Sequence, residues 1–504
     1  MLARTRTLAL IGVEAIPVDV EVDIHRGLPA FSLVGLPDTA VRESRERVRA
    51  AIVNCGFEFP LKRITANLAP ADLRKAGPGF DLAIAASILC ASGQVPSGAL
   101  ERWWLAGELA LDGSVRPLHG VLAMAEGAAL AAEGAGVSPP GVAVASANAA
   151  EARLVDRVEV AALDSLSDLV ALARGELDLG DVDPTRPLPP PELPDMADLR
   201  GQGGLRHGLE VAAAGGHGLL VIGPPGAGKS LAARRLPSIL PPLGRREAIE
   251  VTKIASIAGY PSIDGRLAGR PFRAPHHTIS PAGLVGGGSP PRAGEITLAH
   301  RGVLFLDELG EFARSSLEAL RQPLENGRVT ISRAQGRLTF PADFQIFAAA
   351  NPCPCGHGAE SERCRCRPDQ VRAYEARLSG ALADRFDISM VVEQPSADEL
   401  AGDAGEPSVA VAERVGAARE RQASRLGEGR TNASMSEPEL SRYVRPSAAG
   451  AAALAAGHVS LGLSGRGWNR VLKVARTCAD LAGAEEVTEV HVDTALAMRR
   501  RQAK

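Results

Sequence analysis

The sequence is poor in aromatic residues and carries almost no net charge. Phenylalanine, tyrosine and tryptophan make up 3% of its 504 residues, so the core must be aliphatic and a broad base-stacking platform is not expected. Lysine and arginine number 56 against 59 acidic residues, which gives a formal charge of −3. A histone-like binder is excluded, because any contact with nucleic acid must come from a local basic patch.

Long hydrophobic runs are also missing. No uninterrupted apolar stretch of about 18 residues occurs, and the apolar stretch near the amino terminus is broken at Glu14. Alternation of Val18, Val20 and Val22 with acidic residues then indicates a strand rather than a signal peptide. We therefore expect a cytoplasmic protein without a membrane partner.

Cysteine is scarce and unevenly placed. The seven cysteines are an odd number, which does not fit a secreted disulfide framework. Four of them cluster, Cys353, Cys355, Cys364 and Cys366, and offer the soft ligands that tetrahedral zinc prefers. Because each pair is spaced Cys-x-Cys rather than Cys-x₂-Cys, two interpretations stay open: a structural zinc ion or four reduced thiols.

The length is that of about three domains. Prolines crowd the segment 181–196, where they favour extended backbone and mark a linker. Before the linker the pattern is mixed α/β. After it, apolar strands alternate with helices, as in a parallel sheet with helices on both faces, and the last hundred or so residues are helical in periodicity. We predict domains at 1–180, 197–400 and 401–504.

A phosphate-binding loop is the clearest motif. The apolar run Leu219–Ile222 leads into a sequence of the form G-x-x-x-x-G-K-S, and a helical pattern follows from Leu231. The backbone N–H groups of such a loop wrap a β-phosphate, the lysine reaches the β- and γ-phosphate oxygens, and the serine hydroxyl ligates Mg²⁺. The residues predicted to bind ATP and Mg²⁺ are Gly223, Pro224, Pro225, Gly226, Ala227, Gly228, Lys229 and Ser230.

Two carboxylates follow a second apolar strand. The run from Gly302 to Leu306 ends in Asp307 and Glu308. In a phosphoryl-transfer site Asp307 would hold Mg²⁺ and Glu308 would polarise the attacking water. Nucleotide hydrolysis is therefore the predicted activity.

Two further polar residues fit the same chemistry. Asn351 ends a third apolar run, at the strand end where open α/β sheets bind ligands, and is a candidate to orient the water. An ordinary turn residue is the alternative. Arg385 precedes a fourth apolar run and is a candidate to neutralise γ-phosphate charge in a neighbouring subunit. Its alternative is a salt bridge with Asp384 or Asp387.

In this order the motifs resemble an AAA+ ATPase, and longer segments narrow the resemblance. Residues Arg273–Thr278, Gly294–Gly302, Leu306–Leu309, Asn351–Gly356 and Leu378–Asp387 are similar to the ComM/YifB branch of magnesium-chelatase-like ATPases. The likeness covers essentially the whole chain.

The resemblance implies an α/β fold with three parts. These are an amino-terminal Lon-protease-like (ribosomal S5 domain 2-like) α+β domain, an AAA+ P-loop core and a carboxyl-terminal helical lid. It also implies a homo-hexameric ring that acts on DNA as a helicase or branch-migration motor in recombination or natural transformation. By the same resemblance Arg385 is the arginine finger, Asn351 is sensor 1, and Arg466 is sensor 2 with Arg470 in reserve. Alternatively, the last two arginines only solvate a helix face.

A basic hairpin is predicted between residues 327 and 342. Two β-prone runs flank a glycine-containing turn, and the segment contains Arg328, Arg333 and Arg337. Such arginines bind phosphates without reading sequence, and the resemblance implies that the hairpin enters a central pore. A solvated edge strand protected by its charge is the alternative.

A second basic and glycine-rich segment, 266–301, carries the adjacent residues His276 and His277. Adjacent histidines without further ligands rarely complete a metal site. We interpret them as hydrogen-bonding anchors of a loop, with no catalytic role.

The Lon-like domain raises peptidase as a further activity. Where Lon-type peptidases carry their nucleophilic serine, this sequence has Gly79, which offers no hydroxyl. We therefore expect no peptidase activity, and we interpret the neighbouring Lys75 as a surface or ligand-contacting lysine. The domain is predicted to serve oligomerisation or DNA guidance.

Two functions are compatible with these motifs. The first is an ATP-driven ring motor on DNA, and the second is a magnesium-chelatase-like or chaperone-like ATPase that remodels protein partners. A chelatase is expected to need an integrin-type partner, and no D-x-S-x-S run of that kind occurs in this sequence. A nucleotide-binding scaffold without catalysis is disfavoured, because both Asp307 and Glu308 are present.

Overall fold

The computed structural model describes residues 1–136, 140–179, 193–260, 267–288, 292–333, 336–378, 382 and 385–499, with only the backbone of Ser332, Arg333 and Gly336. The predicted linker lies outside these residues as far as residue 192. The chain divides into two units, and neither is a single continuous segment. Unit 1 comprises Met1–Pro189 and Arg245–Ala268, and unit 2 comprises Pro190–Gly244 and Gly269–Lys504.

Unit 1 is built on a seven-stranded mixed sheet of order β3-β4-β2-β1-β5-β8-β9. The β1–β2 and β2–β4 pairs are antiparallel, and the other neighbours are parallel. The strands are β1 Leu2–Ile11, β2 Glu14–His25, β3 Ala30–Val34, β4 Arg63–Ala69, β5 Trp103–Ala106, β8 Gly141–Ala145 and β9 Glu159–Leu163, and a separate short pair joins β6 Glu108–Leu109 to β7 Val115–Arg116. The strand predicted around Val18, Val20 and Val22 is confirmed within β2.

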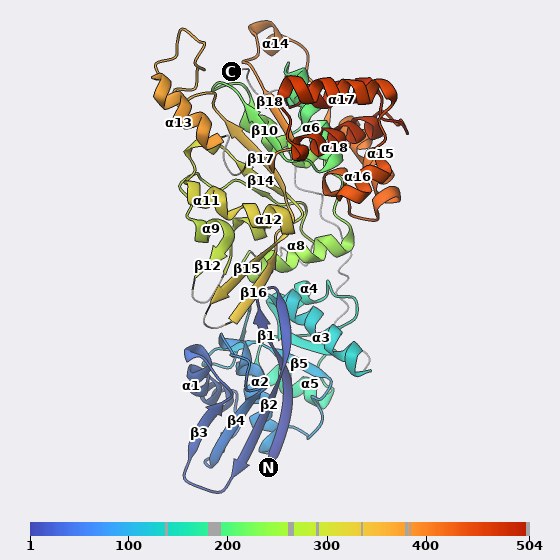
Figure 1. The fold of residues 1–504 in the computed structure, drawn as a ribbon. Coiled ribbons are helices and arrows are strands. Elements are labelled where there is room, and N and C mark those ends of the chain that lie inside the picture. Colours follow the sequence, from blue (N-terminus) through green and yellow to red (C-terminus); the bar gives the residue numbers. More distant parts are fainter. Residues whose placement is uncertain are drawn as a thin grey trace. The chain divides into compact units, whose positions relative to one another are not determined.

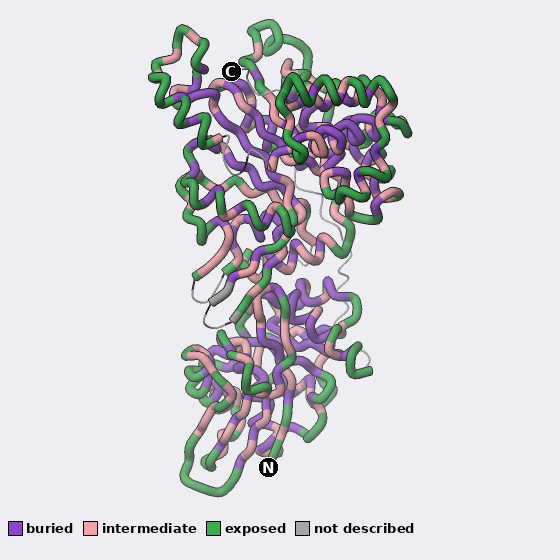
Figure 2. The backbone as a smooth tube through the Cα atoms, viewed as in Figure 1, coloured by how far each residue is buried: buried purple, intermediate pink, exposed green. Residues whose placement is uncertain are grey.

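Helices cover both faces of this sheet. Consecutive strand residues point to opposite faces, so Leu8 belongs to one apolar cluster and Ala9 to the other. The Ala9 cluster includes residues of α1 Thr39–Asn54, α2 Asp81–Ala91 and α5 Leu166–Arg174, and the Leu8 cluster includes residues of α3 Val121–Ala135 and α4 Ser146–Ala152. Buried residues are concentrated in the strands and in the helix sides that face them (Figure 2).

Helix α8, Arg245–Ile257, belongs to unit 1 although the chain on either side of it belongs to unit 2. It packs on α3, where Lys253 forms an ion pair with Glu126. Near its carboxyl end the Ser256 hydroxyl accepts a hydrogen bond of 2.8 Å from the Gly120 N–H. The segment is therefore fixed to unit 1 by polar contacts as well as by apolar packing.

Unit 2 contains a five-stranded sheet of order β11-β14-β17-β10-β18. Every neighbouring pair is parallel, so all the carboxyl ends lie at one edge. The strands are β10 Leu219–Ile222, β11 Phe272–Arg273, β14 Val303–Leu306, β17 Gln345–Ala350 and β18 Ile388–Val391. The predicted parallel sheet is thus confirmed.

Helices flank this sheet on both sides, as Figure 1 shows. In the core of unit 2 they are α6 Gly203–Gly215, α7 Lys229–Arg235, α9 Pro281–Val285, α10 Glu295–Leu298, α11 Arg314–Ala319, α12 Arg321–Asn326 and α13 Pro368–Leu378. Two antiparallel hairpins interrupt the alternation, β12 Gly286–Gly287 with β13 Arg292–Ala293, and β15 Arg328–Arg333 with β16 Gly336–Pro341.

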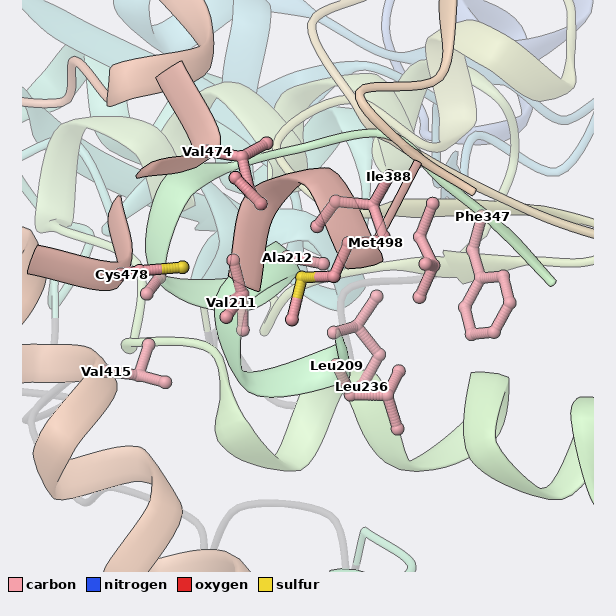
Figure 3. Close-up of a cluster of buried hydrophobic side chains, with 14 of the residues drawn as sticks. Leu209, Val211, Ala212, Leu236, Phe347, Ile388, Val415, Val474, Cys478 and Met498 are labelled. Carbon is pink, nitrogen blue, oxygen red and sulfur yellow. The ribbon is translucent and has the colours of Figure 1, made fainter. Parts of the chain in front are cut away.

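The carboxyl-terminal region is helical, as predicted. Its helices are α14 Ala397–Ala401, α15 Ser408–Leu426, α16 Glu437–Tyr443, α17 Ala448–Leu461, α18 Gly465–Leu481 and α19 Glu489–Ala497. They share one apolar cluster with the sheet, in which Val415 of α15 and Val474 of α18 lie with Leu209 of α6 and Phe347 of β17 (Figure 3). The described helices of the chain include none that is both long and apolar enough to cross a membrane.

Candidate functional site

Polar side chains gather where the parallel strands of unit 2 end. The loop after β10 carries Lys229 and Ser230, β14 is followed by Asp307 and Glu308, and β17 is followed by Asn351. Direct contacts join three of these segments. This is the edge at which open α/β sheets bind ligands.

The Lys229 ammonium lies inside its own loop. Nζ donates to the carbonyls of Gly223 and Pro224, the latter at 2.9 Å, and to Asn351 Oδ1 at 3.2 Å. Burial lowers the pKa of Lys229, while the negative charges of Asp307 and Glu308 oppose that shift. The sequence prediction that Lys229 and Asn351 share one site is therefore matched by a direct hydrogen bond.

The loop backbone follows the path that its glycines permit. Gly226 and Gly228 have φ angles of +81° and +79°, a region that other residues rarely adopt. At the far end of the loop the Ser230 hydroxyl donates to Asp307 Oδ2 at 2.7 Å. A hydroxyl and a carboxylate this close fit a magnesium ion, which prefers hard oxygen ligands.

Glu308 stands in an unusual backbone conformation beside a histidine. Its φ is +52°, in the left-handed region, which is uncommon for a residue other than glycine. Its carboxylate is about half exposed, and Oε2 lies 3.2 Å from Nδ1 of His277. His277 follows β11, so a fourth strand contributes to this edge.

Two residues of the site escaped the sequence analysis. His277 was interpreted only as a loop anchor, yet it contacts the carboxylate predicted to act on water. Gln394 follows β18, and its Nε2 donates to the Pro225 carbonyl at 2.6 Å. Both lie just beyond a strand's carboxyl end, so the rule that selected Asn351 could have found them.

Arg385 lies at the opposite edge of the same sheet. It precedes β18, and its carbonyl lies beside Gly218, the residue before β10. Its guanidinium pairs with Glu325, so the expected alternative pairing with Asp387 is wrong, while Asp384 lies outside the described residues. Within one chain the structure does not bring Arg385 to Lys229.

Arg466 is found near Arg385 and not at the loop. Both line a cavity of about 460 Å³ together with Glu325, Glu437 and Lys473. Helix α18 begins at Gly465, with Ser464 accepting a hydrogen bond from the Gly467 N–H, so Arg466 opens a helix as the resemblance implied.

The reserve residue, Arg470, has another partner. Its Nε lies 3.3 Å from Asp387 Oδ1, and the other carboxylate oxygen lies 2.8 Å from His217 Nδ1. Burial alone would raise the pKa of Asp387, but the hydrogen bond with His217 and the charges of Arg470 and Lys473 lower it. Arg466 is exposed and forms no ion pair with any described residue, which favours it over Arg470.

The four clustered cysteines converge. Each offers a sulfur, and all four sulfurs lie within 4.8 Å of one another. Three Sγ–Sγ distances, among Cys353, Cys355 and Cys364, are 3.4, 3.7 and 3.8 Å. Tetrahedral zinc with Zn–S bonds of about 2.3 Å requires sulfurs about 3.8 Å apart. The cluster is consistent with a zinc site.

Hydrogen bonding prepares one of these thiols for metal binding. The backbone N–H groups of His357 and Arg365 lower the pKa of Cys355 to about 6. Because metals bind the thiolate and not the thiol, this lowered pKa favours the form of the sulfur that a metal ion would bind.

The predicted basic hairpin is present as β15 and β16. The register pairs Ser332 with Arg337 and Arg328 with Pro341, so the two arginines lie on one face, opposite buried Val329. Both arginines are exposed. The side chain of Arg333 lies outside the described residues.

Lys75 lies in the interior of unit 1 and not at its surface. Lys75 is fully buried, and its Nζ donates to the Pro70 carbonyl, so the interpretation as a surface lysine is wrong. Burial lowers its pKa. Gly79 lies in the turn Pro78–Phe80 and supplies no hydroxyl.

Comparison with known families accounts for most of the chain. Residues 195–400 match the family described as magnesium chelatase, subunit ChlI; residues 20–139 match subunit ChlI of Mg-chelatase; and residues 405–499 match the ChlI carboxyl-terminal family. The protein YifB of Salmonella typhimurium is 44% identical over 505 residues, which cover 99% of this chain and 97% of YifB. The chain belongs to the magnesium chelatase ChlI family.

Other full-length relatives lie within the same family. YifB of Escherichia coli is 42% identical over 500 residues, covering 99% of this chain and 97% of that protein. Competence protein ComM of Haemophilus influenzae is 42% identical over 512 residues, with the same coverage of 99% and 97%. This ChlI-family chain is therefore a magnesium-chelatase-like ATPase related to ComM, and its ATPase domain implies ATP hydrolysis.

Proposed function

We propose that this ChlI-family protein is an ATP-hydrolysing AAA+ motor that acts on DNA. The observation that carries the proposal is the meeting of Lys229, Ser230, Asp307 and Asn351 through direct hydrogen bonds at one edge of a parallel sheet. Such an arrangement binds a nucleoside triphosphate with its magnesium ion. The kinship with ComM supports a DNA substrate.

Each residue of the edge has a separate task. Residues Gly223 to Gly228 enclose the phosphates with their backbone N–H groups, and Lys229 binds the β- and γ-phosphate oxygens. Ser230 and Asp307 hold Mg²⁺, which neutralises phosphate charge. Glu308 accepts the proton of the attacking water, and Asn351 orients that water.

Arg385 and Arg466 are proposed to act on the nucleotide of a neighbouring subunit. Both line a cavity at the sheet edge opposite Lys229, so neither reaches the phosphates of its own chain. A closed ring solves this geometry, because each copy then presents its arginine edge to the next copy's phosphate loop. A homo-hexamer is the ring that the family resemblance implies.

The hairpin β15–β16 is proposed to hold DNA phosphates through Arg328, Arg333 and Arg337. Exposed Arg328 and Arg337 share a face with Thr330 and Thr339, whose hydroxyl oxygens are 3.3 Å apart. Arginines and hydroxyls contact phosphate without reading bases, as a motor that moves along any sequence requires.

The remaining assignments follow the same family. We propose that Cys353, Cys355, Cys364 and Cys366 hold a structural zinc ion, and that unit 1 keeps a Lon-like fold without peptidase chemistry, since Gly79 replaces the nucleophile. We also propose three domains, at 1–180, 197–400 and 401–504. The first domain is proposed to serve oligomerisation or DNA guidance, and the protein is proposed to be cytoplasmic.

ATPase and strand-separation assays with single-stranded, forked and four-way DNA test this function. Wild-type turnover should rise with DNA. In Arg328→Ala plus Arg337→Ala the ratio of turnover with DNA to turnover without it should approach one, and the slope of log affinity against log salt should fall by about 2, because two phosphate contacts are lost. Arg314→Ala, an exposed arginine outside the hairpin, is the matched control.

Kinship with the magnesium chelatase subunit supports one alternative, an ATPase that remodels protein partners. If DNA leaves turnover unchanged and a protein partner raises it, the DNA motor is wrong and this alternative holds. The phosphate loop and Glu308 would then serve the same hydrolysis with another substrate.

A further inference from the structure

The cysteine-bearing loop forms one wall of the phosphate loop. Gly356 follows Cys355 and lies so close to Pro225 that a Cβ atom there would be 2.9 Å from the proline's Cγ and Cδ. Cβ atoms in proteins essentially never lie this close to another heavy atom. Nothing therefore separates the backbone of the cysteine loop from the segment that encloses the phosphates.

The same loop also fixes the residue that contacts Lys229. Cys353 is two positions after Asn351 and is fully buried. The Asn351 carboxamide carbon would lie 4.0 Å from a Cβ on Gly356, and its oxygen accepts the 3.2 Å hydrogen bond from Lys229. Gly356 therefore lies beside both Asn351 and Pro225, so a shift of the cysteine loop disturbs the packing around both.

The helix that follows the loop packs on the segment after Glu308. Cys366 is two residues before α13, whose Tyr374 packs so tightly on Gly310 that a Cβ there would overlap the ring. Gly310 lies in the short helix Leu309–Glu311, directly after Glu308. The cysteine loop and the helix after it thus contact three parts of the nucleotide site.

Apart from a few turn hydrogen bonds, this loop lacks regular secondary structure. Residues 352–367 are all described and contain no helix or strand, and ordering such a segment costs backbone conformational entropy. Metal binding by thiolates supplies folding free energy to a segment that lacks regular structure. The four sulfurs are already gathered within 4.8 Å.

We propose that a thiophilic metal ion on Cys353, Cys355, Cys364 and Cys366 braces the nucleotide site, so that the affinity for MgATP depends on the metal. The inference rests on the proposed nucleotide site. Without the metal, the loop loosens and no longer supports Pro225 and Asn351. The expected loss of affinity is about tenfold, at the lower end of the effect of removing a residue that supports a binding site.

The test measures zinc content by elemental analysis and the Kd of a non-hydrolysable MgATP analogue by titration calorimetry on the full chain. Cys364→Ser plus Cys366→Ser should lose zinc and bind the analogue about tenfold more weakly. Cys55→Ser, in the first unit, should change neither. Removing zinc from the wild type with a chelator under reducing conditions should reproduce the double variant, and added zinc should restore the wild-type Kd.

Two glycines of the loop provide a matched pair that keeps all four thiols. Gly356 and Gly358 have nearly equal φ angles, +85° and +87°, so alanine strains both backbones alike. A Cβ on Gly356 meets Pro225, whereas one on Gly358 makes ordinary contact with Pro352 at 3.7 Å. Gly356→Ala should keep its zinc and weaken analogue binding, while Gly358→Ala should keep both.

The outcomes separate this inference from the proposed function. A zinc-free protein that remains folded by circular dichroism and keeps the wild-type Kd overturns the brace and leaves the nucleotide site intact. Equal Kd values for Gly356→Ala and Gly358→Ala also overturn the proposal that the cysteine loop supports the nucleotide site. This pair of variants remains informative if the double cysteine variant does not fold. A zinc-loaded wild type that does not bind the analogue removes the proposed nucleotide site itself.

Discussion

His277 Nδ1 lies 3.2 Å from Oε2 of Glu308. The two residues follow neighbouring strands of the sheet, His277 after β11 and Glu308 after β14. The contact limits the orientations of a carboxylate that is otherwise about half exposed. His277 therefore positions the group that we propose as the base.

Replacing His277 should lower turnover without weakening nucleotide binding. In His277→Ala, Glu308 loses this partner and samples orientations from which it cannot reach the water, so kcat should fall about tenfold, as is usual for groups that orient a catalytic residue. KM for ATP should stay near the wild-type value, because Lys229 bonds to Gly223, Pro224 and Asn351 and not to His277. Steady-state ATPase kinetics measure both.

The conservative variant separates positioning from loop anchoring. His277→Gln can still donate one hydrogen bond to the carboxylate and should recover most of kcat. His276→Ala is the comparison that disturbs the same loop but removes no contact with Glu308, since His276 contacts Thr278 and its ring lies 4.1 Å from that of His277. An unchanged or increased kcat in His277→Ala would show that the histidine does not position a base.

Variants of Lys229 and Glu308 should affect ATP binding and ATP hydrolysis separately. In Lys229→Ala the loop loses the cation that faces the phosphates, so binding of MgATP should disappear. Glu308→Gln keeps the shape of the side chain but removes its basicity. The Kd for MgATP should therefore stay at the wild-type value, while kcat falls at least 10²-fold. Calorimetry and single-turnover hydrolysis check the pair, and wild-type hydrolysis in Glu308→Gln would remove Glu308 from its role.

The buried carboxylate of Asp387 should stabilise unit 2 in a pH-dependent way. His217 and Arg470 contact it, and its pKa is lowered. Asp387→Ala leaves a buried histidine and an arginine without their anion and should reduce the free energy of unfolding by about 3 kcal/mol. Urea unfolding at pH 7 measures this loss, with the exposed Asp369→Ala as the control that changes little.

The direction of the pH effect follows from the lowered pKa. A carboxyl whose folded pKa is below its unfolded value of about 3.9 contributes stability above that pH, and loses the contribution as the pH falls through the folded pKa. The gap between wild type and Asp387→Ala should therefore be widest above about pH 4 and shrink below it. A gap that widens on acidification would contradict the assignment.

The sequence predicted those site residues that form an uninterrupted motif or directly follow an apolar strand. The loop ending in Lys229 and Ser230 is one uninterrupted motif, and Asp307 and Asn351 each follow an apolar strand directly. Parallel strands bring such ends to one edge whatever their order. These side chains could therefore be proposed together before their contacts were known.

Contacts that depend on strand order or on packing could not be predicted. The pairing of His277 with Glu308 requires β11 to lie next to β14, and no local pattern encodes that. Lys75 looked exposed because lysines seldom lie fully buried, but the Pro70 carbonyl provides a partner inside the fold. The amphipathic pattern of α8 identifies a buried face without saying which unit covers it.

Arg385 should complete the site of another subunit. It lies at the sheet edge opposite Glu308, beside Gly218, so a subunit with Arg385→Ala still has an intact phosphate loop, and one with Glu308→Gln still has an intact arginine. Each variant alone should be almost inactive, since an arginine finger is worth 10³–10⁵ in kcat. Mixed, they should regain up to about a quarter of wild-type turnover, because random assembly joins the two intact edges at about one interface in four.

A second mixture controls for simple association. Glu308→Gln and Asp307→Asn both damage the phosphate-binding edge, so no interface between them contains an intact one, and their mixture should stay inactive although both keep Arg385. Recovery in the first mixture and none in the second can arise only if Arg385 acts across an interface. If neither mixture recovers under conditions where wild-type rings exchange subunits, Arg385 does not work in trans, and its contact with Glu325 is then a structural ion pair.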